Sequence, residues 1–298
     1  MQLKKFSSIC FFLLLIPTVL FARDINPIVD TVWMETNLST QGLIIVDIRK
    51  AEEYKEGHIP GAVNLIYGSV AIKRNNLDNE LPLDDDLTDI LNNAGLTKKS
   101  KVVIYNRVDS LPERVNLARV AWTLAYAGID NVAILDGGWA KWTTEKKAVS
   151  KDPSTVKPVT EAYTFNKKII IDRNGVKSRL GKALFLDSRD PEFYFGSVKQ
   201  PYVDKFGRIK GAVLLPASWI FNKEGGFRKI DEIKSYLPGT IGTDLNKEII
   251  VYCDSGRISS AWWYFLTQVF GYKNVVMYDS GIMDYARDES LPTDKLSW

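Results

Sequence analysis

The amino-acid sequence predicts an α/β protein made of two similar domains in tandem, each a mostly parallel sheet with helices on both faces. Short apolar segments of strand length alternate with helix-like segments along most of the chain, a pattern typical of parallel sheets covered by helices. The same succession of segments then occurs a second time, and a repeat this long indicates duplicated domains rather than a solenoid. The length of 298 residues and the 45% hydrophobic content are sufficient for two cores.

The first copy of the pattern is expected over residues 23–146. Its first strand is predicted in LIIVD, which ends at Asp47, and an acidic helical turn leads from there to the HIPGA turn at residues 58–62 and a further strand. The run KVVIY at 101–105 predicts the next strand, and a helix follows over 113–128, where Gly128 is placed to end it. The segment NVAILDGGWAKW at 131–142 predicts a last strand followed by a turn.

Residues 147–164 are predicted to be a linker. They read KAVSKDPSTVKPVTEAYT, are rich in Lys, Ser, Thr and Pro, and show no apolar period. The second domain is therefore expected over residues 165–298.

Four segments of the second half match the first half in the same order: ALFLDSRDPEFYFG, RIKGAVLLP, EIIVYCDSGR and NVVMYDSGIMDYA. In this alignment Asp187 matches Asp47, and the extra residues of the second half fall in the loop 196–206. Cys253 matches Asn106. The first domain therefore lacks a thiol at the position where the second domain has one.

The stretch VYCDSGRISS at residues 251–260 predicts a strand-to-helix turn with Cys253 at its tip, and Ser259 or Ser260 is placed to cap the helix. Unpaired N–H groups at a helix start favour an anion, so this cysteine is expected to form a thiolate more readily than a free one. Arg257 would add to that effect, whereas Asp254 would oppose it. The alternative is a buried structural cysteine, which the polar neighbours disfavour.

Residues 1–22 are predicted to be a secretory signal peptide, cleaved after Ala22. Lys4 and Lys5 precede an apolar stretch over residues 9–21, and this stretch is shorter than the ~20 residues that span a bilayer. The mature chain is therefore expected in the periplasm or outside the cell, without stable membrane insertion.

Cleavage would remove Cys10 and leave Cys253 as the one cysteine, so no internal disulfide is possible. A lone thiol is a hazard in an oxidising compartment, and its presence there favours a functional use. The net charge of +3 is small and the basic residues are scattered, so the composition gives no support to a nucleic-acid partner.

Taken together, these motifs resemble the two-domain rhodanese family, the thiosulfate and 3-mercaptopyruvate sulfurtransferases. The resemblance rests on the HIPGA turn with Asp47 upstream, the LDGGW segment, the cysteine loop after VYC, and YDSGIMDY. It covers the whole mature chain and implies two tandem rhodanese-like domains, of which the first is catalytically silent and the second carries the cysteine. The pairing of Asn106 with Cys253 agrees with that asymmetry.

The resemblance implies that Cys253 takes a sulfane sulfur from a small anionic donor, thiosulfate or 3-mercaptopyruvate, and passes it from a persulfide to a thiol or cyanide. No metal ion and no organic cofactor is expected, and a protein could serve as the sulfur acceptor. The residues expected to bind the donor and the persulfide are those of the loop: Asp254, Ser255, Gly256, Arg257 and Ile258.

Other positions bear on the choice of donor. Ser255 agrees with the loop of the mercaptopyruvate enzymes, and Asp47 and His58 resemble the carboxylate and histidine that join this serine in a proton relay across the domain interface. The alternative for His58, the only histidine, is a packing role in its turn. Phe193 stands where those enzymes have a substrate-binding arginine, so that Arg257 is expected to replace that contact.

Arg189 is predicted to pair with a carboxylate as part of the structure of the second domain, and Asp187 is likewise expected to be structural. Two other cysteine enzymes fit less well: phosphatases need a longer loop before their arginine, and thioredoxin-like proteins need a second cysteine nearby. A persulfide carrier or binding protein with little small-molecule turnover remains the alternative function.

Overall fold

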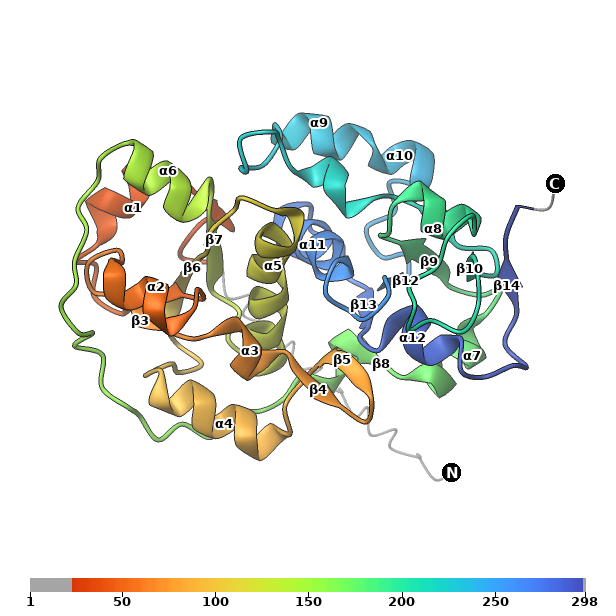
Figure 1. Cartoon of the computed structure of the whole chain (residues 1–298), viewed down its shortest axis with the longest axis horizontal. Coiled ribbons are helices and arrows are strands. Elements are labelled where there is room, and N and C mark those ends of the chain that lie inside the picture. Colours follow the sequence, from red (N-terminus) through yellow and green to blue (C-terminus); the bar gives the residue numbers. More distant parts are fainter. Residues whose placement is uncertain (1–22, 297–298) are drawn as a thin grey trace, which may run out of the picture.

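The computed structural model describes residues 23–296, which form two α/β domains lying side by side (Figure 1). The first domain is coloured red to yellow-green and the second green to blue. The leader predicted for residues 1–22, with Cys10, lies outside the described residues. Within the described part of the chain, no helix is both long enough and apolar enough to cross a membrane.

The first domain is built on a five-stranded sheet in which all neighbouring strands are parallel. In spatial order its strands are β1 (Ile28–Val29), β7 (Val132–Leu135), β6 (Lys101–Tyr105), β2 (Leu43–Asp47) and β3 (Val63–Asn64). Its helices are α1 (Thr31–Asn37), α2 (Ala51–Glu56), α3 (Tyr67–Val70), α4 (Asp84–Asn93), α5 (Leu111–Tyr126) and α6 (Gly138–Thr144). The predicted strands LIIVD and KVVIY are confirmed at both of their ends.

The second domain repeats this sheet strand by strand. Its parallel strands, in the corresponding order, are β8 (Ile170–Ile171), β13 (Val275–Tyr278), β12 (Ile249–Tyr252), β9 (Leu184–Asp187) and β11 (Val213–Leu214). Its α-helices are α7 (Arg173–Arg179), α8 (Pro191–Phe195), α9 (Ile230–Ser235), α10 (Leu237–Thr240), α11 (Ser259–Tyr264) and α12 (Gly281–Tyr285). Short 3-10 helices cover Lys167–Ile169 and Ala217–Ile220, and α11 continues as the π-helix Phe265–Val269. The predicted α/β fold with two tandem domains is therefore confirmed.

The central strands of both sheets are buried, which explains their uninterrupted apolar sequences. Every residue of β12 is buried, and so are residues 102–105 of β6. The loops after these two strands leave the sheets at their carboxyl ends, where open α/β sheets place their binding sites.

Two small antiparallel pairs accompany the main sheets. In the first domain β4 (Ile72–Arg74) pairs with β5 (Leu77–Glu80), and the turn between them carries Asn75 and Asn76 with φ of 53° and 58°. In the second domain β10 (Arg208–Ile209) pairs with β14 (Thr293–Asp294). Figure 1 shows the β4–β5 hairpin extending from the first domain toward the second.

One hydrophobic cluster extends across both domains. The α5 helix packs against α11 across the interface, and the largest cluster of buried apolar side chains draws on both domains. Inside this interface Arg119 of α5, which is fully buried, forms an ion pair with Asp279 of the second domain. The interface is therefore continuous core rather than a loose contact.

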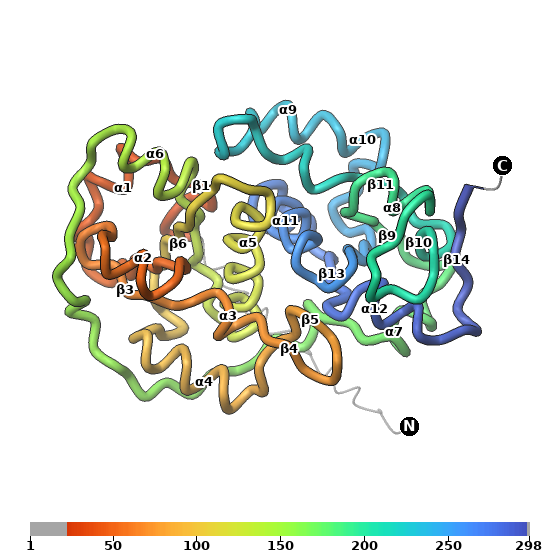
Figure 2. Tube along the Cα trace, viewed as in Figure 1, coloured from red at the N-terminus to blue at the C-terminus, as the bar shows by residue number. Residues whose placement is uncertain are grey.

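The predicted linker, residues 147–164, contains no helix or strand apart from an isolated bridge between Ser150 and His58. It runs along the outer edge of the first domain before entering the second (Figure 2). Hydrogen bonds such as that from Val159 N to Asn92 O, at 3.0 Å, hold it there. The segment thus lies against the first domain, and its exact limits stay a prediction.

Candidate active site

Cys253 follows directly after β12 and begins the loop that leads to α11, so that its predicted place in a strand-to-helix turn is confirmed. The residue is only 1% exposed. The backbone N–H groups of Ser255 and Ser259 donate to its sulfur, and the Ser259 hydroxyl lies 3.5 Å from Sγ. The loop therefore offers several hydrogen-bond donors to one sulfur atom.

The prediction that Ser259 or Ser260 caps the helix is wrong. Ile258 already has helical backbone angles and occupies the N-cap position, so that both serines lie inside the helix. The Ser259 hydroxyl instead faces the cysteine sulfur, and the Ser260 hydroxyl donates to Arg257 O at 2.6 Å.

The expectation of an acidic thiol is also wrong for this state of the protein. Burial raises the pKa of the Cys253 thiol above its ordinary value, and the negative charge of Asp254 raises it further. The hydrogen bonds from Ser259 and Ser255 lower the pKa, but less strongly. The physical reason is that the solvation free energy that a thiolate loses on burial is larger than the stabilisation that these few hydrogen bonds provide.

Asp254 is tied to the second domain's own ion pair. Arg189 bonds Asp187 at 2.7 Å and Gly207 O at 2.8 Å, so the carboxylate partner expected for Arg189 within its own domain is Asp187. Its Nη1 also lies 3.4 Å from Asp254 Oδ1. Burial raises the pKa of the Asp254 carboxyl, and the charge of Arg189 opposes that rise. The arginine thus joins the sheet edge to the cysteine loop.

Gly256 allows the loop to turn next to Asp279. Its φ of 68° lies in the left-handed region, and a Cβ atom here would overlap the backbone carbonyl and the carboxylate of Asp279. The Gly256 carbonyl lies 3.4 Å from Arg119 Nη1, across the domain interface. No other residue type fits this position without displacing its neighbours.

A cavity of about 250 Å³ borders Cys253 at the domain interface. From the second domain it is lined by Cys253, Asp254, Ser255, Arg257, Ile258, Gln200 and Tyr202, and from the first by Asp78, Asn79, Leu111, Pro112 and Val115. All predicted loop residues except Gly256 therefore line one cavity together with the cysteine. The charged side chains among them are one guanidinium and two carboxylates.

Arg257 is held at this cavity by the first domain. Its Nε donates to Asn116 Oδ1 at 2.8 Å, and its guanidinium lies 5.3 Å from the centre of the Tyr67 ring. These two contacts hold the planar guanidinium in place. Among residues 23–296 no carboxylate forms an ion pair with Arg257, so its guanidinium can bind an anion in the cavity.

The structure does not bring Asp47 and His58 to this cavity. Asp47 is bonded by Arg49 and by the Tyr105 hydroxyl, each at 2.6 Å, inside the first domain. The His58 ring stacks on Tyr54 at 3.9 Å, and its two nitrogens lie 2.8 and 2.9 Å from the carbonyls of Tyr54 and Asp152.

In the part of the chain that the structure describes, neither Asp47 nor His58 bonds Ser255 or lines the cavity. The relay is therefore not assembled, and the packing role considered for His58 agrees with its contacts. The position that matches His58 in the second domain is Arg208, which likewise lies over a tyrosine ring, that of Tyr194. Stacking in this turn is thus common to both domains.

Residues of the first domain complete the site, and the sequence did not single them out. Asn79 Nδ2 donates to Ser255 Oγ at 2.9 Å, and Tyr67 OH donates to Asn79 Oδ1 at 2.9 Å. The one signal in the sequence is the asparagine-rich run RNNLDNE at 74–80, which indicates a tight turn. Phe193, by contrast, is not among the residues that line the cavity.

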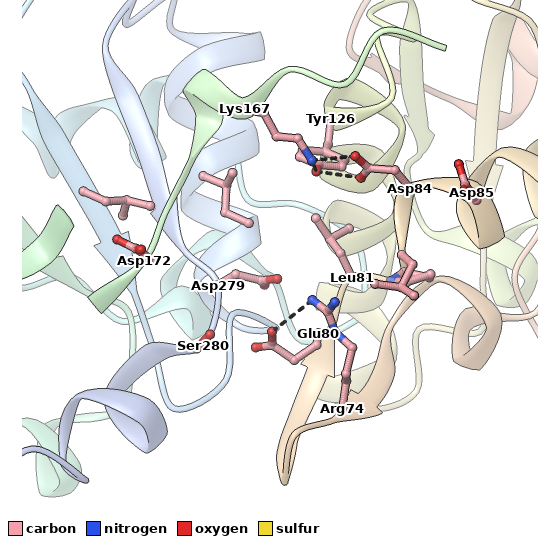
Figure 3. A pocket seen from close by; sticks show the side chains of 14 residues that line it. Arg74, Glu80, Leu81, Asp84, Asp85, Tyr126, Lys167, Asp172, Asp279 and Ser280 are labelled. Carbon is pink, nitrogen blue, oxygen red and sulfur yellow. Dashed lines mark hydrogen bonds and ion pairs between the residues drawn. The ribbon is translucent and has the colours of Figure 1, made fainter. Parts of the chain in front are cut away.

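A larger cavity, of about 760 Å³, lies elsewhere in the domain interface (Figure 3). Glu80 and Arg74 face Asp279 and Ser280 on one side of it, and Lys167 bonds Asp84 on another. None of the predicted site residues lines it. Among residues 23–296, no group of three His, Cys, Asp or Glu side chains is placed to hold a metal ion.

Comparison with known proteins assigns both halves of the chain to one family. The family of rhodanese-like domains matches the chain twice, over residues 30–145 and 172–288. A protein named "Putative thiosulfate sulfurtransferase" from Saccharopolyspora erythraea is 26% identical over 279 residues, which cover 90% of this chain and 95% of that protein. One of the same name from Mycolicibacterium smegmatis is 29% identical over 283 residues, which cover 90% and 97%.

Solved structures share the fold. The anaerobic ergothioneine biosynthesis enzyme from Chlorobium limicola, in complex with trimethyl histidine, superposes with a TM-score of 0.78 at 23% identity, over 91% of this chain and 70% of that one. The wild-type structure of EanB gives 0.72 at 24%, and the match spans 63% of its length. Because the family matches most of the sequence, once in each half, this chain belongs to the rhodanese family and consists of two rhodanese-like domains in tandem.

Proposed function

We propose that this chain is a sulfurtransferase that moves a sulfane sulfur from thiosulfate or 3-mercaptopyruvate to a thiol or cyanide through a persulfide on Cys253. The observation that carries the proposal is the placement of the thiol, which borders a small interface cavity and has backbone N–H groups of Ser255 and Ser259 directed at its sulfur. The names of the relatives from Saccharopolyspora erythraea and Mycolicibacterium smegmatis support the same class of enzyme.

The proposed reaction has two steps. The Cys253 thiolate attacks the outer sulfur of thiosulfate, the sulfur–sulfur bond of the donor breaks, and sulfite leaves with the electron pair. The resulting persulfide is an anion, which the N–H groups of the loop stabilise. A thiolate or cyanide then attacks the outer sulfur, and Cys253 departs as a thiolate ready for the next donor.

The charges around the cavity favour one donor over the other. Arg257 supplies one positive charge, while Asp78 and Asp254 supply two carboxylates. Thiosulfate carries two negative charges and 3-mercaptopyruvate carries one, so that repulsion in the cavity is smaller for the second donor. We therefore expect a higher kcat/KM for 3-mercaptopyruvate than for thiosulfate.

The test is a comparison of the two donors with cyanide as the acceptor, using the chain from Arg23. Intact-mass measurement after donor alone should show an adduct of one sulfur atom on Cys253, and cyanide should remove it as thiocyanate. If neither donor yields an adduct, the proposed function is wrong. Higher turnover with thiosulfate would contradict only the donor preference argued from charge and would leave the proposed sulfur transfer intact.

The burial of the thiol favours a second candidate, a persulfide carrier with little small-molecule turnover. Cys253 is 1% exposed, and burial and Asp254 raise its pKa, which together slow attack on a small donor. In the same experiment, a carrier would form the adduct but fail to release thiocyanate over many turnovers.

We also propose that the protein is exported, on the basis of the apolar stretch and the basic residues in its first 22 residues. Expression of the full chain in a Gram-negative host, followed by fractionation and intact-mass measurement, tests this. A periplasmic protein that begins at Arg23 is expected. A cytoplasmic protein that retains Met1 would contradict it.

A further inference from the structure

A series of hydrogen bonds reaches the cysteine loop from the first domain. Tyr67 at the start of α3 donates to Asn79 in β5, and Asn79 donates to Ser255, which follows Cys253 by two residues. Both bonds measure 2.9 Å. Side chains from two domains are thus linked in a chain that ends beside the reactive sulfur.

The direction of these bonds decides what Ser255 can do. Burial raises the pKa of the Tyr67 phenol, so it keeps its proton at neutral pH and donates to Asn79 Oδ1. The amide nitrogen of Asn79 then faces Ser255, and because that nitrogen has no free lone pair, Ser255 Oγ accepts. The Ser255 proton is not used in this bond and is available to the cavity that Ser255 and Cys253 line.

The backbone of Asn79 is fixed as firmly as its side chain. Its φ of 61° lies in the left-handed region, which asparagine adopts more readily than most residues. Its carbonyl accepts a hydrogen bond from Arg119, the fully buried residue that also pairs with Asp279. The β4–β5 hairpin is therefore bonded to the same arginine that forms the ion pair between the domains.

We propose that Asn79 is a positioning residue for sulfur transfer, which orients the Ser255 hydroxyl so that its proton faces the sulfur that Cys253 takes up. The reaction it serves rests on the function proposed above, whereas its effect on the reactivity of Cys253 does not. In this arrangement Tyr67 and Asn79 support Ser255 from across the interface, where the family resemblance suggested Asp47 and His58 as a possible relay. The first domain, although it lacks a thiol, takes part in the chemistry of the second.

Asn79→Gly is the sharpest variant, because glycine adopts a positive φ freely and only the amide is lost. Loss of one hydrogen bond that orients a reacting group should lower kcat about tenfold, with KM within about twofold. The matched control is Asn76→Gly, which makes the same substitution in the same hairpin at φ 58°. The backbone carbonyl of Asn76, which accepts from Arg287, is retained, so that kcat should not change.

A double-mutant cycle separates positioning from general support. If Asn79 acts through Ser255, the tenfold loss caused by Asn79→Gly disappears when Ser255 is already alanine. A role that only maintains the structure would give the same loss with Ser255→Ala present or absent. That result would overturn the inference.

A second measurement needs no sulfur donor: the rate at which iodoacetamide alkylates Cys253 as a function of pH. In Asn79→Asp the carboxylate accepts a hydrogen bond from the Ser255 hydroxyl, which turns its proton away from the sulfur, and it adds a negative charge to the cavity that the thiol borders. The alkylation curve should therefore move to higher pH. A shift in a protein that turns over no donor would refute the proposed function and support the positioning. An unchanged curve would refute the positioning, whatever the turnover.

Discussion

The loops that follow β6 and β12 start from the same framework and differ in their chemistry. In each domain a tyrosine at the end of the strand donates to a carboxylate on the adjacent strand. Tyr105 bonds Asp47 at 2.6 Å, and Tyr252 bonds Asp187 at 2.9 Å. Both carboxylates also hold an arginine two residues further along the chain. These supports are therefore a property of the fold and not of the reaction.

The residue after each tyrosine, Asn106 or Cys253, is held in the same way through its backbone carbonyl. Asn106 O accepts from Trp139 N at 2.9 Å, and Cys253 O accepts from Ile282 N at 2.8 Å. Beside each carbonyl lies a glycine, Gly138 or Gly281, where a side chain would overlap it. The backbone geometry that presents Cys253 is thus present in the domain that has no thiol.

The loops diverge after this point. Asn106 turns its amide away into α5, where Nδ2 donates to Glu113 O at 2.8 Å, and Arg107 is bound at the surface by Glu53 and Asp109. The second loop instead directs its N–H groups at the cysteine sulfur and borders a cavity. The framework is therefore common to both domains, while the residues between strand and helix determine whether a site exists.

Substitutions at the tips of the two loops, at Cys253 and Asn106, should give the largest effect on sulfur transfer. Cys253→Ser should reduce sulfur transfer below detection and leave the fold intact, since serine retains the size of the side chain but is a far weaker nucleophile. Adding Asn106→Cys to this variant should restore nothing, because the side chain at position 106 is directed at Glu113 O in α5 and does not line the cavity that borders Cys253. Donor-to-cyanide kinetics and circular dichroism measure both. Recovery of activity would break the distinction between the loops.

The carboxylates that follow β13 and β7 should differ in their contribution to stability. Arg119→Met leaves Asp279 buried without its partner, which should lower the free energy of unfolding by about 3–5 kcal/mol. Among residues 23–296 its counterpart Asp136 accepts one hydrogen bond, from the backbone N–H of Phe227 at 2.8 Å, so that Asp136→Asn should cost about 1 kcal/mol. Urea unfolding compares the two variants, and equal losses would contradict the assigned roles.

The first loop has no glycine at the position of Gly256. Gly256→Ala tests whether the tight turn next to Asp279 requires glycine. The new methyl group would overlap Asp279 and force a positive φ on alanine, at a cost of about 3 kcal/mol in unfolding free energy and with loss of activity. Gly181→Ala is the control, because it also has a positive φ, of 72°, but open space around it. That variant should lose about 1 kcal/mol and keep its activity.

Replacement of Asp254 should give the smallest effect, a change in the pH dependence of Cys253. The carboxylate raises the pKa of the thiol, so Asp254→Asn should lower it, and more thiolate should be present at neutral pH. Alkylation by iodoacetamide should then be roughly threefold faster at pH 7. Arg107→Gln, at the matching position of the first loop, should leave the rate unchanged. A slower reaction in Asp254→Asn would show that another group controls the thiol.

The sequence was sufficient for the central strands of the main sheets because each contains an uninterrupted apolar run. The runs LIIVD and KVVIY are buried between layers of helices, and their boundaries coincide with β2 and β6. The β4–β5 hairpin could not be predicted in this way. Its strand β5 reads LDNE, and its position depends on contacts with the other domain, such as that of Asn79 with Ser255.

Only the part of the candidate site that is built from residues adjacent in sequence was predictable. Cys253 and its loop follow from a strand, a turn and a helix adjacent in sequence, but Asn79 and Ser255 lie 176 residues apart. The relay considered for His58 as an alternative to a packing role is not assembled, because the carbonyls of Tyr54 and Asp152 already bond both ring nitrogens. The rise in the pKa of Cys253 was missed because burial depends on the packing of both domains.

The burial of α5 also has a consequence for synthesis. Residues 115–126 of this helix are buried without interruption, partly by α11, which begins only at Ser259. At a usual rate of translation, the ribosome needs on the order of ten seconds to pass from one helix to the other. During that interval the nascent first domain carries an apolar surface that only the later half of the chain covers. Chaperones that bind exposed apolar segments should therefore associate with the first domain until α11 packs against α5.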